Sequence, residues 1–225
     1  MLQRPGSAVA RRPLHFIIIA DCSGSMAAEG KMRALNHAIN ETLPHLRSVA
    51  SENPHAELLV RAVAFSTGAH WHVEDPTPVD RLRWQDLTAG GYTDLGAALD
   101  LVNEQLSDPV MEERSLPPAL LLISDGMPTD DYRRALADLH GSPWGANSVR
   151  MAVGIGRELD IDVLQEFIAD PGIEPMRATH PEQLVSLIRW ASIHVSQSAS
   201  NAAPPARRVG PVAVDRVPSS SDLVW

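Results

Sequence analysis

The sequence predicts an α/β domain in which a mostly parallel sheet of six strands carries helices on both faces. Two observations lead to this fold class. Short apolar runs rich in Ile, Leu and Val are typical of strands buried on both faces. These runs alternate with longer segments whose apolar residues recur every three or four positions, which is typical of parallel strands joined by helical crossovers. We therefore expect a doubly wound sheet.

The first part of the chain is predicted to contain three strands and one helix. The run LHFIIIA (14–20) predicts a central strand, because it is apolar without alternation. Helical spacing of apolar residues follows over 31–49, where Pro44 should kink or break the helix. A second strand is predicted at 56–66, and AHWHVE (69–74), after a turn, predicts an antiparallel edge strand.

The rest of the folded region continues the alternation. A glycine-containing loop leads to a helix for which Thr93 or Asp94 is the expected N-cap. The further predicted elements are helices at 95–106, 130–140, 160–170 and 181–195, and strands at 118–125, 148–156 and 174–179. With the first strand at the centre, the predicted strand order is 3-2-1-4-5-6.

The two ends of the chain lack this periodicity. Residues 1–12 are polar and contain Pro and Gly, and 197–225 are rich in Ser, Ala and Pro. We therefore expect a disordered N-terminal arm over 1–12, one folded domain over 13–196 and a flexible tail over 197–225.

Composition and charge argue against several classes of protein. The formal net charge is −9, whereas binding to nucleic-acid phosphates needs clustered Lys and Arg, so no nucleic-acid partner is expected. No apolar run is long enough to cross a bilayer, so no membrane partner is expected either. The single cysteine excludes an internal disulfide, and the N-terminus lacks the apolar core of a secretory signal. We expect a cytoplasmic protein.

Three polar clusters fall where a parallel sheet binds ligands, at or near the carboxyl ends of its strands. The segments DCSGS, GGYTD and SDG together offer Asp21, Ser23, Ser25, Thr93 and Asp125. Two carboxylates and three hydroxyls form an all-oxygen set, which suits a hard cation such as Mg²⁺. Ser and Asp after a strand are also common helix N-caps. The convergence of three clusters on one edge favours the metal site.

The three clusters resemble the metal-ion-dependent adhesion site (MIDAS) of the von Willebrand factor type A (VWA) domain. DCSGS matches the family's Asp-x-Ser-x-Ser, and Thr93 and Asp125 match its second and third pieces in order, spacing and strand context. The resemblance covers residues 14 to about 195. GGYTDLGAAL and ISDGMPTDD are most similar to the intracellular bacterial TerY-type proteins, which are linked with tellurium resistance and stress operons.

The resemblance implies a role for each matched residue. Ser23, Ser25 and Thr93 would bind Mg²⁺, with Mn²⁺ or Ca²⁺ as alternatives. Asp21 and Asp125 would act mostly through waters, or directly in one state of the site. One coordination position would stay open for an Asp or Glu of a partner protein. The implied protein is a non-enzymatic adaptor in a stress or tellurite-resistance system, with a PP2C-type phosphatase or a protein kinase as candidate partner.

Other classes of function stay open on the sequence. A Mg²⁺-dependent phosphohydrolase could use Asp21 as nucleophile, since a buried strand ending in Asp resembles the haloacid dehalogenase type. That type expects a second acidic residue where this chain has Ser23, and a later lysine, but no lysine follows Lys31. An extracellular adhesin is disfavoured by the free cysteine and by the lack of a signal.

Several conspicuous residues near the clusters have simpler interpretations. Lys31 follows a glycine, but its spacing from Gly24 does not fit a phosphate-binding loop, so we expect a solvated residue at a helix start. Cys22 is expected to be packed rather than reactive. Asp130 and Asp131 are expected to cap the helix that follows them.

Overall fold

The computed structural model describes residues 11–107, 111–125, 127–156 and 159–201, and a six-stranded sheet forms its centre. The strand order is β3-β2-β1-β4-β5-β6, as predicted. β3 (Gly68–Pro78) is the antiparallel edge strand and pairs with β2. The parallel strands are β1 (Arg12–Asp21), β2 (Ala56–Ser66), β4 (Ala119–Ser124), β5 (Val149–Ile155) and β6 (Met176–Ala178).

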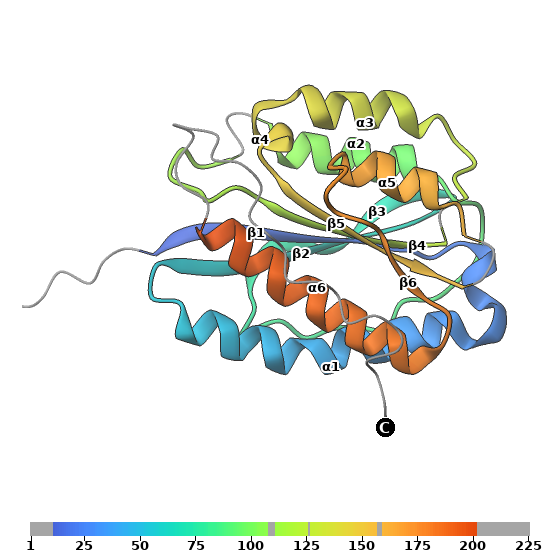
Figure 1. Cartoon of the computed structure of the whole chain (residues 1–225), viewed down its shortest axis with the longest axis horizontal. Helices are drawn as coiled ribbons and strands as arrows, with labels where there is room; N and C mark the ends of the chain where they lie inside the picture. Colours follow the sequence, from blue (N-terminus) through green and yellow to red (C-terminus); the bar gives the residue numbers. More distant parts are fainter. Residues whose placement is uncertain (1–10, 108–110, 126, 157–158, 202–225) are drawn as a thin grey trace, which may run out of the picture.

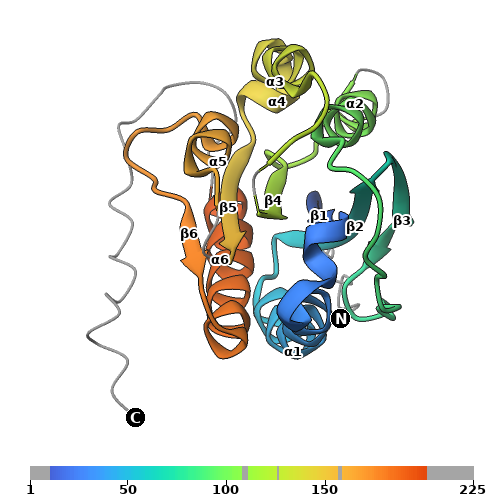
Figure 2. The same cartoon turned by 90° about the vertical axis from the view of Figure 1, so that its right-hand side faces the viewer.

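Helices cover both faces of this sheet, which confirms the doubly wound architecture (Figures 1 and 2). On one face lie α1 (Lys31–Glu52) and α6 (Pro181–Asn201), which pack against each other. On the other face lie α2 (Leu95–Gln105), α3 (Tyr132–Gly141), α4 (Pro143–Ala146) and α5 (Ile161–Ile168). Within the described parts of the chain, no helix combines the length and the apolar character needed to span a membrane.

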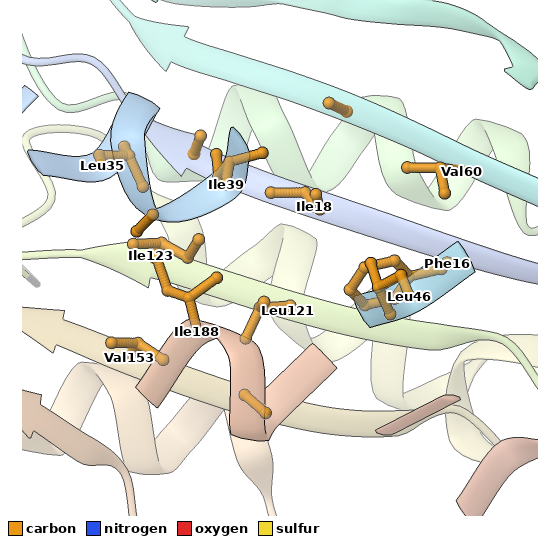
Figure 3. Close-up of a cluster of buried hydrophobic side chains, with 14 of the residues drawn as sticks. Phe16, Ile18, Leu35, Ile39, Leu46, Val60, Leu121, Ile123, Val153 and Ile188 are labelled. Atoms are coloured by element: carbon orange, nitrogen blue, oxygen red, sulfur yellow. The ribbon is translucent and has the colours of Figure 1, made fainter. Parts of the chain in front are cut away.

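The central strand β1 contributes to both apolar layers, because successive side chains of a strand point to opposite faces. Phe16 and Ile18 join the layer beneath α1 and α6, to which α1 contributes Leu35, Ile39 and Leu46 (Figure 3). Ile17 and Ile19 join the layer beneath α2, α3 and α5. All of these side chains are buried. A continuous apolar run was therefore the correct signal for a strand covered on both sides.

Pro44 was predicted to kink or break its helix. It does not break the helix, because α1 is one helix from Lys31 to Glu52. Proline removes the backbone N–H that would bond to the carbonyl four residues earlier, which belongs to the exposed Asn40. Leu43 and Leu46, on either side of the proline, are buried in the core. Packing of the apolar face thus holds the helix together across the missing bond.

The predicted domain limits differ slightly from those of the described elements. β1 begins at Arg12, and the Arg12 guanidinium donates to the backbone carbonyls of Arg114 and Ser115. At the other end, α6 reaches Asn201, five residues beyond the predicted limit. The remainder of the predicted arm and tail lies outside the described residues.

A short 3₁₀ segment, η1 (Gly24–Gly30), was not predicted, nor was α4. Inside η1 the chain reverses at Glu29 and Gly30, which both have positive φ. α1 starts directly after this reversal. The reversal therefore sets where α1 begins, at the same end of the sheet as the end of β1.

The connection between β3 and α2 is fastened to α1 by the buried side chain of Asn36 and, nearer to β3, by the Arg47 guanidinium, which donates to the carbonyls of Val79 and Leu82. The Asn36 amide nitrogen donates to the carbonyl of Leu87 (2.9 Å). Its amide oxygen accepts from the backbone N–H of Leu87 (2.8 Å) and from the indole N–H of Trp84 (3.2 Å). This connection continues into the GGYTD loop, so Asn36 helps to place the loop that carries Thr93.

We expect Asn36→Ala to lower the free energy of unfolding by about 2–4 kcal/mol, because it leaves buried polar groups of the connection without partners. Urea denaturation measures the loss. Asn40→Ala is the matched control, because Asn40 is an exposed residue one turn further along α1 whose amide donates only to the carbonyl of Asn36. Its cost should stay below about 1 kcal/mol. Equal losses in the two variants would contradict the role given to Asn36.

Candidate metal centre

The predicted site residues come from three segments at the carboxyl end of the parallel strands, which faces the viewer in Figure 2. Asp21 is the last residue of β1, and Ser23 and Ser25 follow it. Asp125 directly follows β4, the strand that pairs with β1. Thr93 lies just before α2. The sheet thus delivers the two carboxylates from neighbouring strand ends.

Hydrogen bonds connect four of the five predicted residues. The hydroxyl oxygens of Ser23 and Ser25 are 2.9 Å apart, and the Ser25 hydroxyl donates to Asp125 Oδ2. Asp21 Oδ1 accepts from the backbone N–H of Ser23 (2.8 Å). The oxygen set predicted from DCSGS and SDG therefore forms one contiguous cluster.

Ser124 is a member of this cluster that the sequence analysis missed. Its hydroxyl donates to Asp21 Oδ2 at 2.6 Å, across the pair of strands β1 and β4. The available signal was a hydroxyl residue at the end of a buried strand, next to Asp125. Such a residue lies beside the end of the neighbouring strand once the strand order is known.

Thr93 reaches the same place through its backbone. The GGYTD loop bonds to the first cluster through Gly24 N–H to the Gly91 carbonyl (3.0 Å) and Gly90 N–H to the Cys22 carbonyl (2.8 Å). It bonds to the third segment through Thr129, whose N–H donates to the Thr93 carbonyl (2.9 Å). The Thr129 hydroxyl in turn accepts from the Thr93 N–H (3.0 Å). Thr93 is therefore held, and buried, between the other two segments.

A glycine at position 91 is required by this arrangement. Its φ is +85°, which side-chain-bearing residues rarely adopt. A Cβ there would lie 2.6 Å from the hydroxyl oxygen of Thr67. That hydroxyl accepts from the backbone N–H of Tyr92 (3.1 Å), so it fixes the loop just before Thr93.

The carboxylate of Asp125 provides the test of whether these residues fit a cation. Asp125 is buried, and its Oδ1 atom has no hydrogen-bond partner in the described parts of the chain. A buried carboxylate oxygen without a partner is costly, and a bound cation is one way to satisfy it. The residues present therefore fit a hard divalent cation.

The electrostatics of Asp21 agree with this fit. Asp21 is fully buried. Burial raises the pKa of Asp21 and the charge of Asp125 adds to the rise, although the hydrogen bonds from Ser124 and Ser23 oppose it. A cation would favour the ionised form of both carboxylates. No group of three or more His, Cys, Asp or Glu side chains suited to a metal occurs among the described residues.

The prediction that Lys31 is simply solvated was wrong. Its Nζ lies 3.8 Å from Asp125 Oδ2, and its side chain is only 18% exposed. The cause is the chain reversal at Glu29 and Gly30, which starts α1 beside the end of β4. Sequence spacing excluded a phosphate-binding loop, but it could not show where the helix start would lie.

Asp130 and Asp131 were expected to cap the helix that follows them, α3, and this prediction was also wrong. Asp130 accepts from the backbone N–H groups of Gly96 and Ala97, both at 3.0 Å, and so caps α2 rather than α3. Asp131 occupies the N-cap position of α3, and Asp94 that of α2, but neither makes a capping hydrogen bond with its side chain. The Asp94 carboxylate instead accepts from Gly68 N–H (2.7 Å) and from Thr129 (3.0 Å).

Two large apolar side chains stand exposed on the loops of the site. Tyr92, next to Thr93, is 67% exposed, and Met127, two residues after Asp125, is 58% exposed. Within the described part of the chain, no other large hydrophobic side chain is exposed. Among the described residues, the large apolar side chains that are exposed therefore lie on the loops that carry the oxygen cluster.

Cys22 lies inside the same loop and is packed, as expected. It is buried, and its Sγ lies 3.7 Å from the carbonyl oxygen of Ala20. Burial raises the pKa of the Cys22 thiol to about 12, and the negative charge of Asp21 adds to the effect. The thiolate, which is the reactive form, is thereby suppressed.

We expect Cys22 in the folded protein to react with iodoacetamide at pH 8 at least about 100-fold more slowly than in the urea-unfolded chain, because the unfolded thiol regains an ordinary pKa. Mass spectrometry of the alkylated protein follows both reactions. The chain has one cysteine, so the signal is unambiguous. Similar rates in the two states would show that the thiol is accessible and ionised.

Comparisons with known proteins bear on the fold. No protein-family model and no curated protein sequence matches the chain. Among solved structures, a von Willebrand factor type A protein from Catenulispora acidiphila gives a TM-score of 0.58 at 19% identity, covering 82% of this chain and 43% of that one. Proximal thread matrix protein 1 from the mussel byssus, described with a zinc-occupied MIDAS motif, gives 0.59 at 16% identity, with coverages of 81% and 48%.

A third similar structure is the manganese-loaded TRAP protein of Plasmodium vivax, with a TM-score of 0.57 at 20% identity, covering 80% of this chain and 74% of that one. At these identities the likeness shows the fold, and the expected VWA-like fold is confirmed. The chain spans less than half the length of the first two structures. The TerY-type assignment stays a prediction.

Proposed function

We propose that this protein is a metal-dependent protein-binding module. Asp21, Ser23, Ser25, Thr93 and Asp125 would hold a divalent cation, and a carboxylate from a partner protein would complete its coordination. The observation that carries the proposal is the buried, unpartnered Oδ1 atom of Asp125 within a cluster of side-chain oxygens. The bound ion would supply positive charge and an open coordination position for a carboxylate oxygen of the partner.

The composition of the cluster favours Mg²⁺, with Mn²⁺ and Ca²⁺ as alternatives. Mg²⁺ takes six oxygen ligands, and five side chains leave at least one position for water or a partner. Among the similar structures, the mussel byssus protein is described with zinc in its MIDAS motif, and the Plasmodium vivax TRAP protein is described as loaded with manganese. A hard, all-oxygen set suits Mg²⁺ and Mn²⁺ better than zinc.

The surroundings of the cluster support binding to another protein. Tyr92 and Met127 are exposed on the loops next to Thr93 and Asp125. Aromatic residues and Met are enriched in protein–protein interfaces. A partner would therefore present an acidic residue with apolar neighbours.

A binding role is also favoured over phosphate-ester hydrolysis. A nucleophilic Asp21 would need a carboxylate oxygen that faces the substrate. Both of its oxygens instead accept hydrogen bonds, from Ser23 N–H and from Ser124, and the residue is fully buried. We infer that Asp21 positions the Ser23 loop and offsets the charge of the ion, without attacking a substrate.

The cellular setting of the proposal comes from the TerY-type resemblance. The partner would be a PP2C-type phosphatase or a protein kinase, and the setting a cytoplasmic stress or tellurite-resistance system. The overall negative charge of the chain agrees with a protein rather than a nucleic-acid partner.

We expect Asp125→Asn to weaken Mg²⁺ or Mn²⁺ binding at least about tenfold, because it removes one of two anionic groups while keeping the side-chain shape. Isothermal titration calorimetry measures the affinity. Asp86→Asn is the control, since Asp86 is exposed on the connection between β3 and α2. Unchanged binding by the Asp125 variant would overturn the metal site.

Partner capture should depend on the metal. We expect the immobilised protein to retain a candidate phosphatase or kinase in Mg²⁺, to lose it in EDTA and to recover it when Mg²⁺ is restored. The Asp125→Asn variant should capture less of the partner at the same Mg²⁺ concentration, because a smaller fraction of its sites would hold the ion that the outside carboxylate binds. Retention in EDTA would contradict the proposal, and turnover of p-nitrophenyl phosphate that depends on Asp21 would favour the hydrolase instead.

A further inference from the structure

Lys31 is the one lysine of the sequence, and its ammonium group lies at the edge of the oxygen cluster. Nζ is 3.8 Å from Asp125 Oδ2, the same oxygen that accepts from Ser25. The alkyl chain crosses Gly156, where a Cβ would come within 3.2 Å of both Cε and Nζ. The absence of a side chain at Gly156 therefore leaves the space in which the lysine lies.

Helix stability does not explain a lysine at this position. Lys31 is the first residue of α1, where the helix macrodipole is positive and disfavours a cation. Most of its side chain is shielded from water, so the charge is also partly desolvated. The favourable interaction that offsets both costs is the one with the carboxylate of Asp125.

We propose that Lys31 is a built-in counter-cation that weakens metal binding and strengthens the binding of an outside carboxylate to the metal-loaded site. This rests on the proposed function. Asp21, Asp125 and Lys31 together carry a formal charge of about −1, and a divalent cation changes this to about +1. One carboxylate from a partner then brings the site to neutrality. Without the lysine, the loaded site would already be neutral and the carboxylate would make it negative.

The proposal predicts effects of opposite sign from one substitution. Lys31→Met keeps an unbranched chain over Gly156 and removes the charge. We expect it to bind Mn²⁺ about tenfold more tightly, and its Mn²⁺-loaded form to bind acetate about tenfold more weakly. Lys31→Arg retains the positive charge and should stay within about threefold of the wild type in both measurements.

The two affinities are measured with simple probes. Electron paramagnetic resonance of free Mn²⁺ gives the metal affinity at fixed ionic strength. Relaxation of the acetate methyl protons in the presence of Mn²⁺-loaded protein gives the acetate affinity, with the EDTA-treated protein as blank. Circular dichroism and urea unfolding in EDTA establish that each variant is folded, and Lys31→Gln replaces Lys31→Met if the latter is not.

The outcomes separate this inference from the proposed function. Unchanged Mn²⁺ affinity in Lys31→Met, alongside weakened Mn²⁺ binding in Asp125→Asn, would overturn the role of Lys31 and leave the metal site in place. A charge-neutral variant that gains affinity for both Mn²⁺ and acetate would also overturn it. A wild-type protein that binds no Mn²⁺, Mg²⁺ or Ca²⁺ would end both proposals.

Discussion

The hydrogen bond from the Ser124 hydroxyl to Asp21 Oδ2 is the contact on which the arrangement of the site depends. It joins the ends of β1 and β4, the two adjacent strands at the centre of the sheet. It orients the Asp21 carboxylate so that the other oxygen accepts from Ser23 N–H, which in turn sets the serine loop. Asp125 follows Ser124 directly and is thereby brought to the same loop. A single side-chain contact between strands thus aligns two loops.

The sheet and its two apolar layers were predictable because a strand that is buried on both faces has an uninterrupted run of apolar residues. The uninterrupted run at 14–20 and the helical spacing of 31–49 each correspond to an observed element. Local propensity failed at Pro44, where packing of Leu43 and Leu46 outweighs one missing hydrogen bond. Periodicity therefore predicts elements well when the core, rather than local chemistry, decides them.

The candidate site was predictable as a set of residues and only partly as an arrangement. Spacing could identify Asp21, Ser23 and Asp125, since each lies at the end of a strand or just beyond it. It could not show that Asp130 caps α2, because the partners are more than thirty positions apart. It could not place Lys31 either, because that depends on backbone angles at Glu29 and Gly30. Contacts between loops that are far apart in the sequence cannot be predicted from the residue pattern of one segment alone.

The capping of α2 by Asp130 has a consequence for the order in which the chain folds. The first turn of a helix leaves backbone N–H groups without intrahelical partners. In α2, the groups of Gly96 and Ala97 find theirs on a loop that follows β4. Local sequence cannot complete this turn, and closing a loop of that length carries an entropic cost. We therefore expect the first turn of α2 to become fully hydrogen-bonded only once the loop after β4 has docked beside it, which would couple the loop that carries Thr93 to the pairing of β4 with β1.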